Sequence, residues 1–250
     1  MMTRWIAVTA FTAGMISQAG MSYAAEIKVM ASAAFKEAYI ELVPEFERAT
    51  GHKVVTIWTP TVEMMKRLKG GEIVDLVIIA VDSLAELIKL GRIAPESRVD
   101  IAKSGIGVAI RAGASKPDIR STEALKRALL AAKSIAYSTG PSGVYIISLF
   151  QRLGIAEELK PKIKQVQGVP IGELVSRGEA EIGFQQVSEI LPVAGIELLG
   201  PLPAEIQRIT VFSTGLHVGA QQPEAARALV KFFTAPAAHP VIRKKGMEPG

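Results

Sequence analysis

The sequence predicts an α/β protein of two lobes, with parallel-type sheets flanked by helices and two crossing strands as the hinge. Short apolar runs alternate with helical runs, an order typical of parallel sheets. The alternation occurs twice, in halves of about 80–110 residues, which is within the usual range for one domain. Two β-type segments, around 104–111 and 208–217, are placed to cross between the halves.

The N-terminal segment 1–24 is expected to be a signal peptide. Arg4 precedes an apolar run from Trp5 to Ile16, and Ser22-Tyr23-Ala24 fits the small-x-small cleavage pattern. The apolar run is too short for a membrane anchor, which needs about 20 predominantly apolar residues. We therefore expect export to the periplasm with cleavage near Ala24.

The first half of the mature chain contains three strand–helix pairs. The run at 74–80 is almost wholly apolar, as expected for a strand that is covered on both faces. Gly51 and Gly71 follow helical runs and are typical helix ends. The predicted strands are 26–32, 52–59 and 74–80, and the predicted helices are 33–51, 61–71 and 82–93.

The middle of the chain repeats this alternation, and a last strand and helix close it. The predicted strands are 105–113, 133–138, 161–167, 180–190 (running into a turn) and 208–219, and the predicted helices are 117–132, 143–154, 170–178 and 223–236. These elements predict one lobe from 25–104 and 212–250, and a second lobe from 105–211. Because the chain crosses between the lobes twice, we expect the two lobes to close on each other rather than to move as independent domains on one linker.

Composition excludes several classes of function. The chain has no cysteine, so its stability cannot depend on disulfides. Its charge of +5 is scattered along the chain and its aromatic content is 6%, so no nucleic-acid partner is predicted. We expect a monomer.

Motifs for catalysis and cofactors are missing from the sequence. His52, His217 and His239 lie far apart, whereas metal sites need several converging donors, so no metal is expected. There is no GxSxG, no P-loop and no GxGxxG that follows a strand. We expect no cofactor, and on motifs alone a binding protein is favoured over an enzyme.

Small or neutral polar residues follow four of the predicted strands. Ligands of open α/β sheets bind beyond the carboxyl ends of strands, where helix N-termini offer unpaired N–H groups to anions. Serine and threonine are also ordinary helix caps. Together, however, four uncharged strand ends favour a site for a small anion that is held and later released. These ends are 32–34, 59–61, 138–143 and 185–188.

Four segments carry a resemblance to a known family: "VMASAAFKEAYIELVPEFERATGHKV", "MKRLKGGEIVDLVIIA", "PSGVYIISLFQRLG" and "LVSRGEAEIGFQQ". In this order and spacing they resemble the periplasmic molybdate-binding proteins, the solute-binding components of ABC importers. The resemblance covers essentially the whole mature chain. It implies the type II periplasmic binding protein fold, and an ABC permease in the inner membrane as partner.

The resemblance also implies positions for ligand contacts. The family's first serine falls on Ala34, with Ser32 two residues earlier, and its second serine falls on Thr61. Its tyrosine falls on Gln186. The expected ligand-binding residues are Ser32, Ala33, Ala34, Thr59, Thr61, Ser142, Gly143, Gln167, Gly168 and Gln186. The departures at Ala34 and Gln186 argue against molybdate and suit a larger organic acid.

The sequence therefore supports two functions. The first is a periplasmic solute-binding protein that closes on an oxyanion or an organic carboxylate. The alternative is an exported isomerase on the same scaffold, acting on a di- or tricarboxylate, because the segment 106–138 is similar to the aconitate isomerase branch. An isomerase needs a general base near the migrating proton. Lys36, Glu37, Tyr145 and Glu189 lie near the strand ends, but the sequence does not choose among them.

Overall fold

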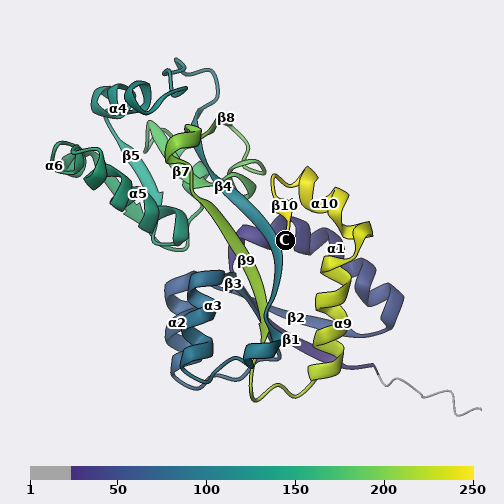
Figure 1. The fold of residues 1–250 in the computed structure, drawn as a ribbon. Coiled ribbons are helices and arrows are strands. Elements are labelled where there is room, and N and C mark those ends of the chain that lie inside the picture. The colour runs from purple at the N-terminus through teal and green to yellow at the C-terminus, as the bar shows by residue number, and fades with distance from the viewer. Residues whose placement is uncertain (1–23) are drawn as a thin grey trace, which may run out of the picture.

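The computed structural model describes residues 24–250, and the predicted signal peptide lies outside them except for Ala24. Figure 1 shows two lobes connected by two long strands, β4 (Val99–Arg111) and β9 (Ile209–Leu216). The two-lobed α/β prediction is confirmed. Among residues 24–250, no helix is long and apolar enough to cross a membrane.

The first lobe contains the N- and C-terminal parts of the described chain. Its elements are β1 (Glu26–Ala31), η1 (Ala33–Phe35), α1 (Lys36–Thr50), β2 (Lys53–Trp58), α2 (Thr61–Lys69), β3 (Leu76–Ala80), α3 (Val81–Lys89), η2 (Pro95–Ser97), α9 (Pro223–Thr234), η5 (Pro236–Ala238), α10 (His239–Lys244) and β10 (Glu248–Pro249). Strands β2, β1 and β3 are parallel neighbours, and β9 joins β3 antiparallel. Every residue of β3 is buried, as its apolar sequence predicts.

The second lobe contains the middle of the chain. Its elements are α4 (Thr122–Ala131), β5 (Ile135–Ser138), α5 (Pro141–Arg152), α6 (Ala156–Leu159), η3 (Lys160–Lys162), β6 (Ile163–Val166), α7 (Ile171–Ser176), β7 (Ile182–Gln186), α8 (Val187–Ile190), β8 (Ile196–Pro201) and η4 (Ala204–Ile206). Strands β6, β5 and β7 are parallel neighbours, and β4 and β8 extend this sheet antiparallel.

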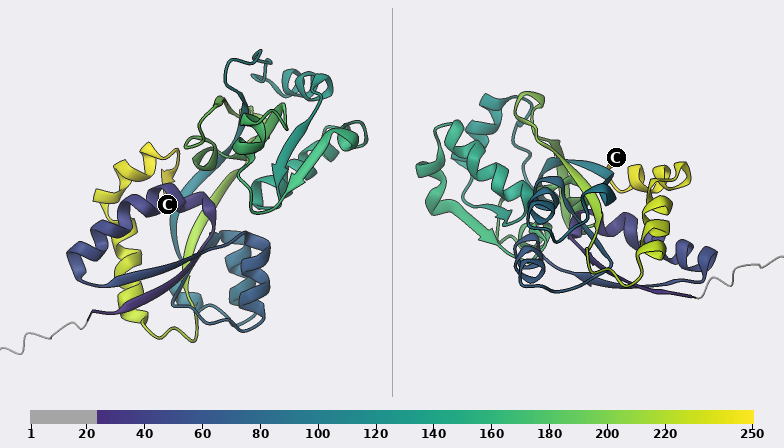
Figure 2. Two further views of the ribbon diagram at one scale, coloured as in Figure 1. Left: turned by 180° about the vertical axis from the view of Figure 1, so that it is seen from behind. Right: turned by 60° about the horizontal axis from the view of Figure 1, so that its bottom comes forward.

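The crossing strands connect the two sheets. β4 pairs with β9 over Val99–Gly105 and with β7 over Ile106–Ala109, so one strand belongs to both lobes. The two opposite views of Figures 1 and 2 show β4 and β9 running side by side between the lobes. Each lobe has its own apolar core, centred on Phe35 and Phe233 in the first lobe and on Phe150 and Phe184 in the second.

Several predicted boundaries were wrong. The first crossing strand begins at Val99 rather than near 104, because its "VDIAKS" start is only partly buried and lacks an apolar pattern. Strand β8 was missed, since its half-buried sequence includes Gly200 and Pro201. The strand predicted over 180–190 ends at Gln186 and is followed by the short helix α8, and the chain continues past α9 into α10 and β10.

Candidate functional site

A cleft of about 780 Å³ lies where the two lobes face each other. Residues from all four predicted strand ends line it, because the carboxyl ends of β1, β2, β5 and β7 meet there. Of the expected ligand-binding residues, Ser32, Ala33, Ala34, Thr59, Thr61, Ser142, Gly168 and Gln186 line the cleft. Gly143 and Gln167 are not among the lining residues.

The end of β1 carries a buried hydroxyl group without a hydrogen-bond partner. The Ser32 backbone N–H donates to the Ile78 carbonyl at 3.0 Å, which ties the turn to β3. The Ser32 side chain is buried, yet its Oγ has no hydrogen-bond partner. Ala33 is exposed, and Ala34 is packed into the first-lobe core. The small side chains therefore leave the start of α1 accessible from the cleft.

The end of β5 is closed by internal hydrogen bonds. Ser138 Oγ accepts from the Gly140 N–H at 3.2 Å, and the Thr139 N–H donates to the Val166 carbonyl at 3.1 Å. A Cβ at Gly143 would lie 1.6 Å from the Ser138 carbonyl oxygen, so only glycine fits there. Gly143 therefore has a packing role, which the sequence did not distinguish from a ligand contact.

The end of β7 connects the cleft to the crossing strands. With its nitrogen directed toward β4, the buried Gln186 amide donates to the Ser104 and Gly105 carbonyls at 3.0 and 3.2 Å. Its oxygen accepts from Thr210 Oγ1 on β9 at 2.9 Å. All of these partners are on β4 and β9, so this side chain ties the second lobe to both crossing strands.

Glu189 is a partly buried carboxyl group of the cleft. Its Oε1 accepts a hydrogen bond from Gln185 Nε2 at 2.9 Å. Burial raises the pKa of Glu189 to about 7, although bonds from the Gln185 side chain and the Gln186 backbone oppose the shift. A carboxyl group with such a pKa exchanges its proton near neutral pH.

The other candidate bases fall in different places. Lys36 and Glu37 line the cleft. Tyr145 is not among the lining residues, and its hydroxyl donates to the Ile206 carbonyl at 2.7 Å and accepts from Arg152 Nη2 at 2.7 Å. This candidate from the sequence is therefore unsuited to reach a ligand in the cleft.

The two lobes approach each other at the rim of the cleft. Gly168 has a φ of 74°, and a Cβ there would lie 3.6 Å from Pro60 Cγ of the first lobe. Gln167, its exposed neighbour, lies outside the lining. The loop after β6 thus faces the loop after β2 through Gly168 rather than through Gln167.

The cleft also has apolar walls. Trp58 and Pro60 belong to the first lobe, Pro141 and Val193 to the second, and Phe212 to β9. Lys36 Nζ lies 6.0 Å from the centroid of the Trp58 ring. The site therefore combines hydroxyls, amides and one ammonium group with hydrocarbon surface.

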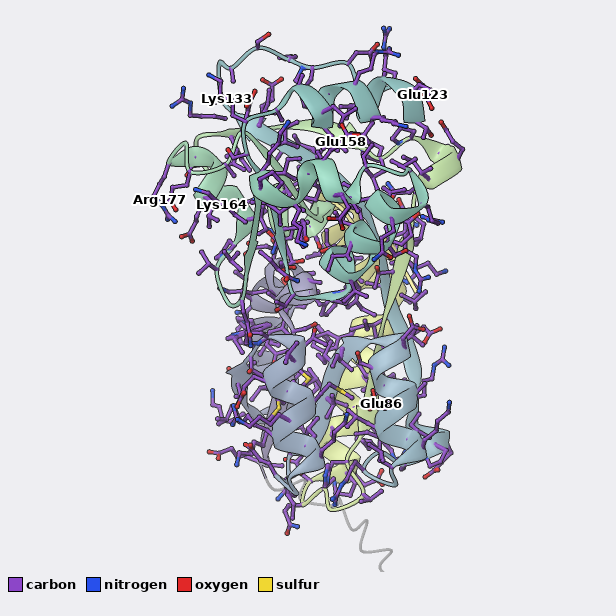
Figure 3. The ribbon with its side chains drawn as sticks, turned by 90° about the vertical axis from the view of Figure 1, so that its left-hand side faces the viewer. Glu86, Glu123, Lys133, Glu158, Lys164 and Arg177 are labelled. Carbon is purple, nitrogen blue, oxygen red and sulfur yellow. The ribbon has the colours of Figure 1, made fainter. Side chains whose placement is uncertain are left out.

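Charged side chains are concentrated outside the cleft. Figure 3 shows Lys133, Lys164 and Arg177 on the outer surface of the second lobe, and Glu86 on the first. The charged lining residues are Lys36, Glu37, Glu173 and Glu189. Within residues 24–250, no group of three His, Asp or Glu side chains could hold a metal ion.

The sequence placed Ser188 at the fourth strand end but did not single it out as a ligand contact. It is buried, it lines the cleft, and its Oγ has no hydrogen-bond partner. The available signal was its place two residues after β7, at the fourth strand end. Without the fold, a serine at this position could not be distinguished from an ordinary helix-start residue.

Two α/β lobes, two crossing strands and a cleft lined by strand ends define a solute-binding protein. Residues 27–248 match the family described as bacterial extracellular solute-binding protein, and the chain belongs to that family. This confirms the resemblance inferred from the sequence, and the family implies a periplasmic location.

The similar proteins include an isomerase and a molybdate-binding protein. The chain is 36% identical to an aconitate isomerase of Pseudomonas sp, over 89% of this chain and 87% of that one. It is 30% identical to the molybdate-binding protein ModA of Azotobacter vinelandii, over 96% of this chain and 95% of that one. A solved Azotobacter vinelandii periplasmic molybdate-binding protein superposes with a TM-score of 0.72 at 20% identity, over 88% and 98% of the chains.

Proposed function

We propose that this chain is a periplasmic binding protein whose lobes close on a small organic carboxylate. The observation that carries the proposal is the mixed lining of the cleft. Hydroxyl groups of Ser32 and Ser188 suit a carboxylate, while Trp58 and Phe212 suit a carbon skeleton. A tetrahedral oxyanion has no such skeleton and gains little from aromatic walls.

The polar part of the lining supports an anionic ligand. Helix α5 directs its N-terminus at the cleft, where Pro141 and Ser142 line the wall. A helix N-terminus favours negative charge through its unpaired N–H groups and its dipole. Lys36 supplies a positive charge at the same cleft.

The residues at two family positions support an organic acid over molybdate. Ala34 provides no hydroxyl where the molybdate binders have a serine, and its side chain packs into the core. The Gln186 amide is engaged by β4 and β9, so it has little capacity left for a ligand. The aconitate isomerase relative points in the same direction.

Closure would bend the crossing strands. We place the hinge where β4 changes partners, between Gly105 and Ile106, which fits a first lobe of 25–104 and 212–250 and a second lobe of 105–211. The closed form would deliver its ligand to an ABC permease as a monomer. Export would depend on the signal peptide, with cleavage near Ala24.

Isothermal titration against an anion panel tests this function. The panel contains trans-aconitate, tricarballylate, citrate, succinate, molybdate, tungstate and sulfate. We expect at least one di- or tricarboxylate to bind at least tenfold more tightly than any oxyanion. Tighter binding of molybdate or tungstate, or binding of no carboxylate, would contradict the proposal.

A second candidate function is isomerisation of an unsaturated tricarboxylate. Glu189 in the cleft and the aconitate isomerase relative favour it. The Glu189 carboxylate would remove a proton from a methylene carbon beside a carboxylate, and the double bond would shift toward that carbon. The resulting carboxylic acid would return a proton to the far alkene carbon, so no other reactant is needed.

Proton NMR of trans-aconitate mixed with the protein tests this second function. Isomerisation would produce cis-aconitate signals, and in D2O deuterium would enter the methylene group. An unchanged spectrum after hours at high protein concentration would reject the isomerase. It would leave the binding function standing.

A further inference from the structure

Two residues that line the cleft from opposite lobes have buried hydroxyl groups without a hydrogen-bond partner. Ser32 Oγ follows β1, and Ser188 Oγ is on α8. Their residues are 6% and 2% exposed, and α8 packs against η1 directly after Ser32. Buried hydroxyl groups are normally hydrogen-bonded, and leaving one unpaired is unfavourable. Two such groups in one cleft indicate a polar group that binds there.

The next residue along α8 adds an ionisable group to this pair. Glu189 Oε1 accepts from Gln185 Nε2, and Gln185 Oε1 accepts from the Ile171 N–H at 2.9 Å. The second bond fixes the Gln185 amide, so its N–H group faces Glu189. The proton of a protonated Glu189 would therefore be carried by Oε2, which can donate it to a ligand.

The charges around Glu189 are mixed. Lys36 and Glu37 on α1 and Glu173 on α7 line the same cleft. Lys244 at the end of α10 and Lys245 directly after it line a smaller adjoining pocket with Ser188 and Glu37, and both lysines pair with Glu41. None of these cations makes a salt bridge with Glu189 within the described residues, so burial dominates its proton affinity.

We propose that Ser32, Ser188 and Glu189 form a subsite for one carboxylate group of the ligand, and that Glu189 takes up a solvent proton when this group binds. The inference rests on the proposed function and specifies how that site recognises its ligand. A neutral Glu189 donates a hydrogen bond to the carboxylate, whereas an ionised Glu189 repels it. Binding is therefore strongest at and below neutral pH.

A purely structural role for Glu189 makes different predictions. Glu189 is the third residue of α8, and its bond to the Gln186 backbone N–H resembles half of a capping box. A capping group would affect stability without linking ligand binding to proton uptake. The test therefore measures how many protons the protein takes up when the ligand binds.

Titration calorimetry with tricarballylate separates the two roles, because this tricarboxylate has no double bond to isomerise. The heat is measured at pH 5.5, 7 and 8, each in two buffers of different ionisation enthalpy. We expect nearly one proton taken up per ligand at pH 8, almost none at pH 5.5, and affinity up to about tenfold weaker at pH 8 than at pH 7. In E189Q the uptake should vanish and the affinity should no longer depend on pH.

Matched variants complete the test. E173Q removes another carboxylate of the lining and should leave the uptake unchanged. S188A should weaken tricarballylate at least about tenfold without lowering the melting temperature, and it serves as the test if E189Q does not fold. Uptake that persists in E189Q, or binding without uptake in the unchanged protein, overturns the subsite. Failure to bind any carboxylate of the panel overturns the proposed function itself.

Discussion

Two turns of small residues face the cleft, and they are small for different reasons. "ASAA" at 31–34 follows β1 and presents a buried hydroxyl without a partner at Ser32. In "STGPSG" at 138–143, which follows β5, the Ser138 hydroxyl and the Thr139 N–H are already paired within the chain. The first turn leaves its buried hydroxyl unpaired, whereas the second pairs its first hydroxyl and needs Gly143 in order to pack.

Residue size at a strand end therefore does not by itself identify a ligand contact. Small residues permit close approach, but the approaching group can be a ligand or the chain's own backbone. The hydrogen bonds of each turn separate the two cases, because a buried hydroxyl group without a partner in the protein needs a ligand or water to bond to. The end of β7 combines both cases, with Gln186 paired and Ser188 free.

The largest expected effect is at Gly143. In G143A the new Cβ would collide with the Ser138 carbonyl, so α5 must shift from the end of β5. We expect a loss of about 3–5 kcal/mol in the free energy of unfolding, measured by urea denaturation. G140A is the control, since its Cβ would meet Ser138 Oγ at 3.3 Å and should cost about 1 kcal/mol or less. Equal effects of the two variants would refute the packing role.

The next effect concerns Glu189 and pH. Its pKa is raised from 4.5 to about 7, so the folded state holds a proton that the unfolded state releases between these values. Stability from this group is therefore full below about pH 4.5 and falls as pH rises through 7. E189Q removes the cost of ionising a buried carboxyl group. The change in the free energy of unfolding caused by E189Q should therefore be about 2–3 kcal/mol more favourable at pH 8 than at pH 4.5.

Denaturation of both proteins at the two pH values gives this difference directly. Effects of Gln that do not depend on pH, such as a changed contact with the Gln186 N–H, cancel in the comparison. A difference near zero would mean that Glu189 titrates normally. The proton-linked subsite would then fail as well.

A smaller effect separates the two turns themselves. S32A removes the free hydroxyl and should weaken carboxylate binding about tenfold, while stability stays equal or rises slightly. S138A removes an acceptor of the Gly140 N–H, so it should cost about 1 kcal/mol of stability with less than a twofold change in affinity. Calorimetry measures the affinity of both variants, and thermal melting measures their stability. The reverse pattern would invalidate the distinction between the turns.

The smallest effect is expected for Lys36, which is exposed at the cleft near Trp58. K36Q should slow ligand association about two- to fivefold at low salt, because Lys36 attracts anions over a distance. The difference should shrink at high salt through screening. Stopped-flow measurements of tryptophan fluorescence at two salt concentrations check this, and a salt-independent change would contradict it.

The alternation of elements could be predicted from the sequence because periodicity reports burial locally. The apolar run of β3 and the helical patterns of α1 and α9 are examples. Strand β8 could not be predicted in this way, since it is half-buried and gains its place only by pairing with β4. The start of β4 at Val99 could not be predicted for the same reason, because this part of the strand is only partly buried.

The site could be predicted only as a set of strand ends. That most of the expected residues line one cleft follows from fold topology, which the element order implies. The separate roles of Gly143 and Gln186 depend on distances to Ser138, β4 and β9, and no local pattern contains those distances. Ser188 is distinguished from its neighbours at the fourth strand end only by its burial and its missing hydrogen-bond partner.

A crystal structure grown with tricarballylate tests the central claim most directly. We expect the tricarboxylate between the lobes, with one carboxylate within about 2.5–3.2 Å of both Ser32 Oγ and Ser188 Oγ and its carbon chain against Trp58. A ligand bound elsewhere, or a closed cleft in which both hydroxyl groups stay unpartnered, would contradict it.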